Sequence, residues 1–245
     1  IPTPGVAYLT RKLQADASVV ISASHNTYEF NGIKYFSNKG MKIPDDVEKE
    51  IEEVMDSGKL DELSAVSEKI GVSEVSTDLL DEYVYFFRKN FDDNIARLNR
   101  PDFKVVIDTA NGATYQVADK VFTTLGINHV IINNKPDGIN INAGCGSTHL
   151  EMLKEYVVKN KMSLGIAYDG DGDRCLAVDE NGEEIDGDKL LAIISQYLRK
   201  QGKLAKDTIV ATVMSNLGLN KFAEKNNLNL KLTKVGDRYV LEEML

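Results

Sequence analysis

Short apolar runs and longer amphipathic stretches alternate along the second half of the chain. Apolar runs of strand length occur at residues 103–109, 129–133 and 163–169. Between them, residues 115–126 and 149–160 repeat their apolar positions with helical spacing. Strands that alternate with helices form mostly parallel sheets, because each helix returns the chain to the same end of the sheet. The pattern predicts the α/β fold class, with mixed, mostly parallel sheets flanked by helices.

The first hundred residues show the same patterns with a polar interruption. The β-branched run at 17–24 and the extended piece at 31–43 predict strands, and residues 45–58 place their apolar side chains on one helical face. Residues 59–76 are polar and aperiodic, so we expect a linker there. A strongly apolar helix is expected at 78–91.

Local signals place the start and end of some helices. Thr148 and Glu151 have the spacing of a capping box, in which two side chains satisfy the free backbone N–H groups of a helix start. Gly126 predicts the end of the preceding helix. From residue 188 to the end, three helices and two strands continue the alternation.

Composition narrows the function classes. The chain has 245 residues, 42% hydrophobic and 27% charged, which is ordinary for a soluble protein of two or more domains. A net charge of −9 without a Lys/Arg-rich run argues against nucleic acid as a main partner. No apolar run approaches the about 20 residues of a membrane span, so no membrane partner is expected. The two cysteines, Cys145 and Cys175, are too few for a disulfide scaffold, which favours the cytoplasm.

Three aspartates, Asp169, Asp171 and Asp173, alternate with glycines directly after the strand at 163–169, and Arg174 follows them. Two like charges 4 Å apart repel by roughly 4 kcal/mol near a protein surface, so something must offset the repulsion. A solvated turn is one interpretation, because Gly and Asp are both turn residues. Against it, ligands of α/β proteins gather at the carboxyl ends of strands, where these aspartates lie.

Two kinds of metal site can explain the aspartates. The spacing matches the first ligand positions of an EF-hand, with Glu180 at the twelfth, but Arg174 stands where that loop requires glycine. Magnesium fits better, because carboxylate oxygens suit a hard cation and Mg²⁺ leaves positions open for a substrate phosphate. Arg174 can then bind an anion. The pattern predicts a magnesium site that handles phosphate.

A candidate phosphate carrier ends the first predicted strand. Ser24 follows the apolar run, His25 is next, and Lys34 lies in the following extended piece. A hydrolase is disfavoured, since the chain has no G-x-S-x-G elbow and adjacent residues rarely align as nucleophile and base. A phosphorylated Ser24 would bring negative charge and an oxygen ligand to the magnesium, and could pass its phosphoryl group to a sugar hydroxyl. Lys34 is a candidate donor or acid/base partner.

These motifs resemble those of a known enzyme family. The runs ISASHN, NGIKYFS and AYDGDGDR are similar to the phosphoserine loop and the metal loop of the α-D-phosphohexomutases. Within that superfamily, TPGVAYLTR, NINAGCGSTHLEML and KVGDRYVLEEML most resemble the bacterial members that act on glucosamine phosphate. The resemblance extends over essentially the whole chain. It implies interconversion of glucosamine 6-phosphate and glucosamine 1-phosphate through a phosphoserine enzyme and a bisphosphate intermediate, toward UDP-N-acetylglucosamine and the cell wall.

The resemblance also implies a role for each motif residue. Ser24 would be the catalytic phosphoserine and, with Asp169, Asp171 and Asp173, would hold one Mg²⁺ per site. Arg174 would contact the serine phosphate.

Further residues receive roles on the same grounds. His25 and Lys34 would support catalysis or act as acid and base. Lys234, Asp237 and Arg238 would lie near the sugar and its phosphate, although the same run is also typical of a helix start, where Asp237 suits the helix dipole. The expected partner is a phosphorylated hexosamine.

The family is built of four domains around one cleft, and this chain matches only part of them. Residues 1–75 would be the C-terminal part of domain 1, with the phosphoserine loop. Residues 76–184 would be domain 2, with the metal loop, and 185–245 the N-terminal part of domain 3. A chain that begins with Ile1 and stops at Leu245, before the family's sugar-recognition loop, is expected to be a fragment with little or no turnover.

Two positions depart from the family pattern. Thr27 stands where proline is usual, and Phe30 where an acidic residue often precedes the Asn-Gly pair. We expect Thr27 to loosen the loop by at most about 1 kcal/mol. Two alternatives stay open: a phosphomannomutase or phosphoglucomutase relative with the same chemistry on another hexose, and a non-catalytic module that binds Mg²⁺ or Ca²⁺. The oligomeric state is not indicated.

Overall fold

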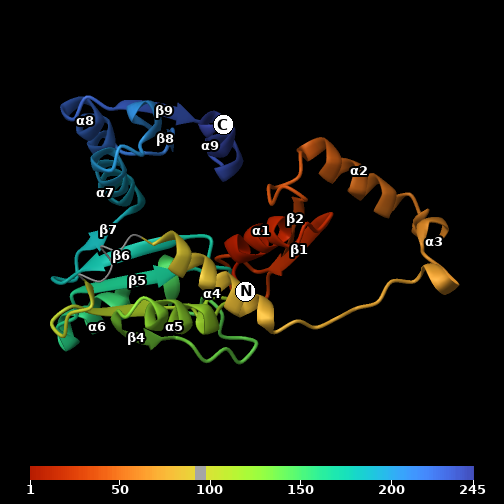
Figure 1. Ribbon diagram of the computed structural model, residues 1–245, viewed down its shortest axis with the longest axis horizontal. Helices are drawn as coiled ribbons and strands as arrows, with labels where there is room; N and C mark the ends of the chain where they lie inside the picture. Colours follow the sequence, from red (N-terminus) through yellow and green to blue (C-terminus); the bar gives the residue numbers. More distant parts are fainter. Residues whose placement is uncertain (92–97) are drawn as a thin grey trace.

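The computed structural model describes residues 1–91 and 98–245, and its elements gather in three units along the chain (Figure 1). The first unit is a helix beside an antiparallel strand pair, followed by helices that lead away from it. Its elements are α1 (Thr3–Lys12), β1 (Ala17–Ser22), β2 (Gly32–Ser37), α2 (Asp45–Asp56), α3 (Leu60–Leu63) and a 3₁₀ turn at Ser67–Lys69.

β1 and β2 pair along their whole length, with Ala17 opposite Ser37 and Ser22 opposite Gly32. The loop between them, residues 23–31, is therefore held at the tip of a hairpin, and we call it the serine loop. The predicted linker at 59–76 is exposed throughout and contains only short helical turns, as the extended orange trace in Figure 1 shows.

The second unit is a five-stranded mixed sheet with strand order β4-β3-β5-β6-β7. β3 pairs in parallel with β4 and β5, whereas β5–β6 and β6–β7 are antiparallel. Its elements are α4 (Asp78–Asn90), β3 (Lys104–Asp108), α5 (Tyr115–Thr124), β4 (Asn128–Ile132), a 3₁₀ turn (Gly146–Thr148), α6 (Glu151–Asn160), β5 (Leu164–Tyr168), β6 (Cys175–Asp179) and β7 (Glu184–Ile185).

β3 lies inside this sheet and is buried on both faces. Val105 and Ile107 pack with Ala118 of α5, and Val106 packs with Leu153 of α6, because successive side chains of a strand point to opposite faces. The α/β fold class is confirmed. Antiparallel pairing is more extensive than predicted, because the loop from β5 to β6 is far too short for a parallel crossover.

The third unit packs two parallel strands against helices. Ile209, Leu219 and Ala223 form its small core. Across residues 1–91 and 98–245, no helix combines the length and the apolar character that crossing a membrane requires. The elements of this unit are α7 (Gly187–Lys200), a 3₁₀ turn (Ala205–Asp207), β8 (Thr208–Thr212), α8 (Leu217–Lys225), β9 (Asn229–Thr233) and α9 (Asp237–Met244).

The predicted capping box at Thr148 and Glu151 is wrong. α6 begins at Glu151 and its N-cap position is Leu150, which makes no side-chain bond to the helix. Thr148 ends the preceding 3₁₀ turn, and its hydroxyl bonds a neighbouring side chain instead. The buried Asp108 carboxylate accepts the N–H of Gly146 at 2.9 Å, and this anchor sets the path on which the chain enters the helix.

Candidate functional site

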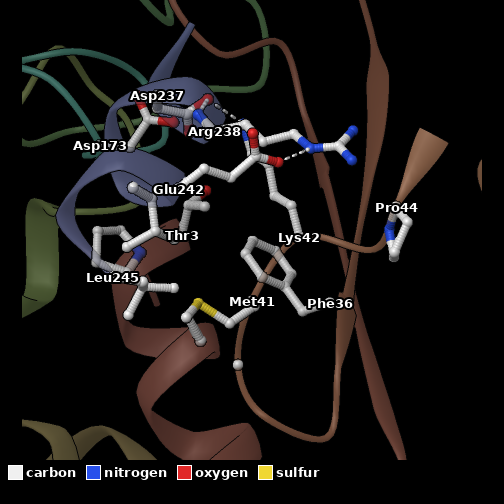
Figure 2. Close-up of a pocket in the computed structure, with 14 residues that line it drawn as sticks. Thr3, Phe36, Met41, Lys42, Pro44, Asp173, Asp237, Arg238, Glu242 and Leu245 are labelled. Carbon is white, nitrogen blue, oxygen red and sulfur yellow. Dashed lines mark hydrogen bonds and ion pairs between the residues drawn. The ribbon is translucent and has the colours of Figure 1, made fainter. Parts of the chain in front are cut away.

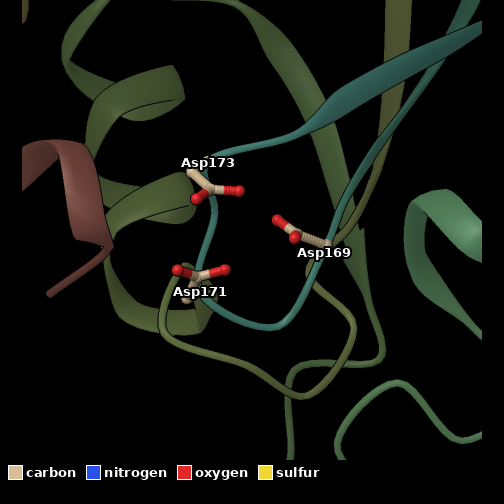
Figure 3. A group of neighbouring side chains, drawn as sticks. All are labelled: Asp169, Asp171 and Asp173. Carbon is tan, nitrogen blue, oxygen red and sulfur yellow. The ribbon is translucent and has the colours of Figure 1, made fainter. Parts of the chain in front are cut away.

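The three predicted metal ligands lie together in residues 169–174, between β5 and β6, which we call the acidic loop. Each of Asp169, Asp171 and Asp173 offers one carboxylate oxygen, and these oxygens all lie within 4.8 Å of one another (Figure 3). Asp169 and Asp171 are 0% and 2% exposed, whereas the Asp173 side chain is 25% exposed. Two of the three charges are therefore removed from water and need a counter-charge.

Two buried oxygens of this loop lack a donor. Asp169 Oδ2 and Asp171 Oδ1 make no hydrogen bond within the part of the chain that the structure describes. A buried, unpaired carboxylate oxygen is costly, and a hard divalent cation would satisfy both atoms at once. The donor set, all oxygen and converging from three carboxylates, fits Mg²⁺.

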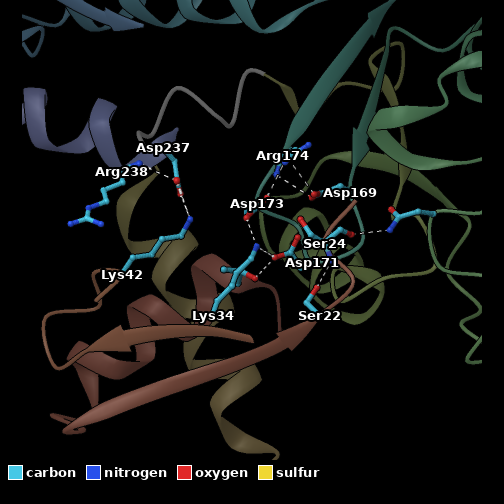
Figure 4. Close-up of polar contacts among 12 residues, drawn as sticks. Ser22, Ser24, Lys34, Lys42, Asp169, Asp171, Asp173, Arg174, Asp237 and Arg238 are labelled. Carbon is cyan, nitrogen blue, oxygen red and sulfur yellow. Dashed lines mark hydrogen bonds and ion pairs between the residues drawn. The ribbon is translucent and has the colours of Figure 1, made fainter. Parts of the chain in front are cut away.

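Lys34 supplies positive charge to the loop from strand β2. Its Nζ lies 2.5 Å from Asp171 Oδ2 and 2.8 Å from Asp173 Oδ2 (Figure 4). Thr3, the first residue of α1, donates its backbone N–H to the Asp171 carbonyl at 2.8 Å and its hydroxyl to the Asp171 carboxylate at 2.5 Å. The first unit thus holds the acidic loop at two points.

Burial and hydrogen bonding shift the pKa values of this cluster in opposite directions. Burial, with repulsion from the neighbouring carboxylates, raises the pKa of Asp169 to about 6. Burial also acts to raise the pKa of Asp171, but hydrogen bonds from Lys34 and Thr3 outweigh it and hold that pKa below its ordinary value. Burial acts to lower the pKa of Lys34, yet its carboxylate partners raise it above its ordinary value. Lys34 is therefore a cationic donor at neutral pH in this arrangement.

The serine loop meets the acidic loop, backbone against backbone. A Cβ atom added to Gly170 would lie 2.5 Å from the carbonyl oxygen of Ser24, so only glycine fits this contact. Ser24 donates its N–H to Ser22 Oγ at 2.8 Å and has a φ of +54°, a left-handed conformation that is uncommon for a residue other than glycine. Ser24 and Asp171 overlap in the view of Figure 4, and the Gly170 contact brings the Ser24 backbone against the acidic loop.

The two departures from the family pattern lie in this loop. The Thr27 side chain hydrogen-bonds the Glu29 carboxylate and so lowers the pKa of Glu29. The Phe30 N–H donates to the Thr27 carbonyl at 3.1 Å, and the Phe30 side chain is 58% exposed. Local bonds around Thr27 therefore restrain the turn where the family usually has proline.

Arg174 lies at the edge of the carboxylate cluster. Arg174 Nε is 3.9 Å from Asp169 Oδ2 and 4.0 Å from Asp173 Oδ1, and its side chain is 53% exposed. The guanidinium can therefore bind an anion that approaches from solvent. His25 directly follows Ser24, and its buried Nδ1 has no hydrogen-bond partner among the described residues.

Of the three predicted substrate-binding residues, Asp237 and Arg238 contact the first unit, whereas Lys234 contacts a residue of its own unit. At the start of α9, Asp237 forms an ion pair with Lys42 of the first unit (Figure 4). Arg238 forms another with Asp45 of the same unit. Burial acts to raise the pKa of Asp237, but the bond from Lys42 holds it below its ordinary value. Lys234 lies over an aromatic ring of its own unit, 5.8 Å from the ring centroid.

Two neighbouring cavities lie at the start of α9, and one of them reaches the acidic loop. One, of about 400 Å³, is lined by Asp173 together with Asp237 and Arg238 (Figure 2). The other, of about 290 Å³, is lined by Lys34 and the same two α9 residues. Lys234 lines neither of them. Asp237 and Arg238 thus line both cavities directly, whereas Lys234 contacts the Tyr239 ring, which lines the smaller one.

Sequence reasoning missed Asn142 and Thr3. Asn142 is 1% exposed, and its side-chain amide donates to the carbonyls of Ser24 at 2.8 Å and Asn26 at 2.7 Å. Thr3 bonds Asp171. Both contacts join segments far apart in sequence, so no spacing signal points to them.

Three family profiles match the chain in order. Their descriptions are phosphoglucomutase/phosphomannomutase alpha/beta/alpha domain I at residues 1–62, domain II at 81–182 and domain III at 186–245. The chain is also 54% identical, over all 245 residues, to the phosphoglucosamine mutase of Acetivibrio thermocellus. It spans about half of that relative, 53% of its length.

Solved structures share the fold. A phosphoglucomutase/phosphomannomutase family protein from Burkholderia thailandensis matches 100% of this chain and 52% of its own, with a TM-score of 0.80 and 22% identity. An Aspergillus fumigatus N-acetylphosphoglucosamine mutase, solved in complex with GlcNAc-6P and magnesium, matches 98% of this chain and 61% of its own, with a TM-score of 0.60 and 17% identity.

Proposed function

The chain belongs to the phosphoglucomutase/phosphomannomutase family, and we propose that it carries the catalytic serine and the metal loop of a phosphoglucosamine mutase. The proposed reaction interconverts glucosamine 6-phosphate and glucosamine 1-phosphate, a step toward UDP-N-acetylglucosamine and the cell wall. The observation that carries the proposal is the contact between the Ser24 carbonyl and Gly170, which brings the serine loop onto the carboxylates.

Asp169, Asp171 and Asp173 would hold one Mg²⁺, and a phosphate on Ser24 would supply a further oxygen ligand. The two buried carboxylate oxygens without a donor among the described residues support this ligand set, as does the magnesium complex of the Aspergillus structure. When bound, Mg²⁺ would supply positive charge that stabilises the phosphoryl group in transfer.

The protein's own residues would position and protonate the reacting groups. The bond between phosphorus and Ser24 Oγ breaks as a sugar hydroxyl oxygen attacks the phosphorus, and the other phosphate of the bisphosphate later returns to Oγ. Arg174 would bind the serine phosphate, because its guanidinium is exposed beside the carboxylates. Lys34 would donate to the transferring oxygens and return a proton to the leaving Ser24 Oγ, and His25, next to Ser24 in the chain, would take up the proton of the sugar hydroxyl.

The substrate would lie between the first and third units. Asp237 and Arg238 would contact the sugar and its phosphate, a placement supported by their position in both cavities. Lys234 was predicted to join them, but it lines neither cavity and instead covers the Tyr239 ring, which lines the smaller one, so that role has less direct support.

Domain limits and location are also proposed. Division of the chain at 75/76 is supported by the exposed linker. Division at 184/185 passes through β7, and the start of α7 at Gly187 supports a boundary just after that strand. A cytoplasmic location is supported by the free thiols of Cys145 and Cys175.

The test is phosphorylation at Ser24 in the complete protein that carries this sequence. Intact-mass measurement should find a phosphorylated fraction that Ser24→Ala abolishes, together with turnover of glucosamine 6-phosphate. Ser37→Ala is the matched control, because Ser37 lies on the same hairpin with its hydroxyl bonded to the Met41 carbonyl. A Ser24→Ala protein that keeps its phosphate and its turnover would overturn the proposal.

The choice of hexose needs its own comparison. Turnover of the 6-phosphates of glucosamine, glucose and mannose should be highest for glucosamine. A preference for glucose or mannose would favour the phosphoglucomutase or phosphomannomutase alternative, which the family profiles also allow. Metal binding without any phosphate on the serine would favour the non-catalytic module.

A further inference from the structure

Asn142 ties the serine loop to the central unit. Its side chain is 1% exposed, and Nδ2 donates one hydrogen to the carbonyl of Ser24 at 2.8 Å and the other to the carbonyl of Asn26 at 2.7 Å. These two carbonyls flank His25. A single buried amide therefore spans the turn that presents Ser24 and His25 to the acidic loop.

The same amide also touches the acidic loop. A Cβ atom on Gly170 would lie 2.6 Å from Asn142 Nδ2 and 2.5 Å from the Ser24 carbonyl oxygen. The N–H of Ala113 donates to the Gly170 carbonyl at 2.7 Å and holds this part of the loop in place. The serine loop, the acidic loop and the Asn142 side chain thus share one contact.

Asn142 is itself fixed to the end of strand β3. Its N–H donates to the Ala110 carbonyl at 3.0 Å, and the N–H of Ala110 donates to Asp108 Oδ1 at 2.8 Å. The second oxygen of Asp108, which is 0% exposed, accepts the N–H of Gly146 at 2.9 Å. Because this anchor is a buried strand end, the amide has a rigid support.

We propose that Asn142 is a positioning residue that sets how Ser24 presents its hydroxyl to the acidic loop. Ser24 has a φ of +54°, a conformation that surrounding structure must enforce in a residue other than glycine. The two bonds from Asn142 Nδ2 to the turn enforce it. The inference rests on the proposed function, since the presentation of Ser24 matters to turnover only if that hydroxyl carries the phosphoryl group.

Two substitutions remove the Asn142 amide without straining the backbone at this position. Asn142 has a φ of +55°, which glycine adopts freely and aspartate more readily than most residues. Asn142→Gly deletes both hydrogen bonds. Asn142→Asp keeps the shape but turns carboxylate oxygens toward two carbonyls, at a site where Asn142 Oδ1 already finds no donor within the described residues. Asn140→Asp is the matched control, because within residues 1–91 and 98–245 the Asn140 side chain bonds only to backbone groups of Lys135 and Asp137 in its own loop.

The experiment measures kcat and KM for glucosamine 6-phosphate in the complete protein, with melting temperature and Mg²⁺ binding for each variant. Both Asn142 variants should lose about 10- to 100-fold in kcat, because a small misplacement of a reacting group costs that much. KM should stay within about threefold, since the sugar cavities lie elsewhere, and Mg²⁺ binding should be kept. The melting temperature should fall, because the carbonyls of Ser24 and Asn26 lose their donor. Asn140→Asp should change neither kinetic constant.

Other results would overturn the inference. If both Asn142 variants keep kcat within about threefold of the unchanged protein, the amide does not position Ser24. If kcat falls together with Mg²⁺ binding, Asn142 supports the fold of the acidic loop instead of positioning Ser24. Ser24→Ala separates the two proposals: retained turnover there defeats the proposed function, whereas its loss beside fully active Asn142 variants defeats only the positioning role.

Discussion

Replacing Lys34 by methionine should make the stability of this protein depend on a divalent cation. Lys34 Nζ lies within 2.8 Å of carboxylate oxygens of both Asp171 and Asp173, and Asp171 is 2% exposed. Methionine keeps most of the apolar stem and removes the charge. The carboxylates would then repel one another without a cation between them.

The magnitude follows from burial. Removing one partner of a fully buried ion pair costs about 3–5 kcal/mol, and partial exposure of Lys34 at 22% and Asp173 at 25% reduces this to about 2–3 kcal/mol. For a chain of this size, that loss corresponds to a fall of about 4–12 °C in melting temperature. With saturating Mg²⁺, the metal charge replaces that of Lys34, and the loss should shrink to below about 1 kcal/mol.

The assay is thermal unfolding with EDTA and with Mg²⁺. Lys120→Met is the control, because Lys120 also forms a 2.5 Å ion pair, with Asp81, but both side chains are exposed, at 45% and 70%. Its loss should be below about 1 kcal/mol with or without metal. The reasoning fails if Lys34→Met costs no more than Lys120→Met in EDTA, or if Mg²⁺ raises the melting temperature of Lys34→Met no more than that of the unchanged protein.

Three further outcomes are expected. Gly170→Ala should lower kcat at least about tenfold, because the added methyl would lie 2.5 Å from the Ser24 carbonyl oxygen of the serine loop. Gly187→Ala is the control and should leave kcat unchanged, because no atom lies within 4 Å of its added methyl. Equal kcat values for the two variants would contradict this prediction. Arg238→Ala should raise KM about 10- to 100-fold, because the substrate would lose a charged hydrogen bond from the cavity wall. Lys234→Ala should leave KM unchanged, because Lys234 lines neither cavity. Similar KM values for the two variants would argue against the cavity as the substrate site. Since burial raises the pKa of Asp169 to about 6, stabilisation by Mg²⁺ should weaken as the pH falls through about 6. In EDTA, the contribution of neutral Asp169 to stability should be complete below its unfolded pKa of about 3.9 and lost as the pH rises through about 6. Asp169→Asn should remove both dependences, and melting curves from pH 4 to 8 that match the unchanged protein would refute the assignment.

Local patterns in the sequence determined the elements and the acidic loop. Val105, Val106 and Ile107 are apolar in succession, which is typical of a strand buried on both faces, and β3 is such a strand. The three aspartates stand within five residues after a strand, so any tight turn there must bring their carboxylates together. Such features depend on residues close together in the sequence, so the sequence alone is enough to predict them.

Only the tertiary structure decided which distant segments meet. The Ser24 carbonyl lies against Gly170, and the Asn142 side chain joins the serine loop to the central unit. Lys34 forms ion pairs with Asp171 and Asp173. The start of α6 depends on the anchor at Asp108 rather than on its capping residues. These outcomes follow from how the units pack against one another. Contacts across long sequence separations leave no periodicity or spacing in the sequence, because the two residues come into contact only once the chain has folded.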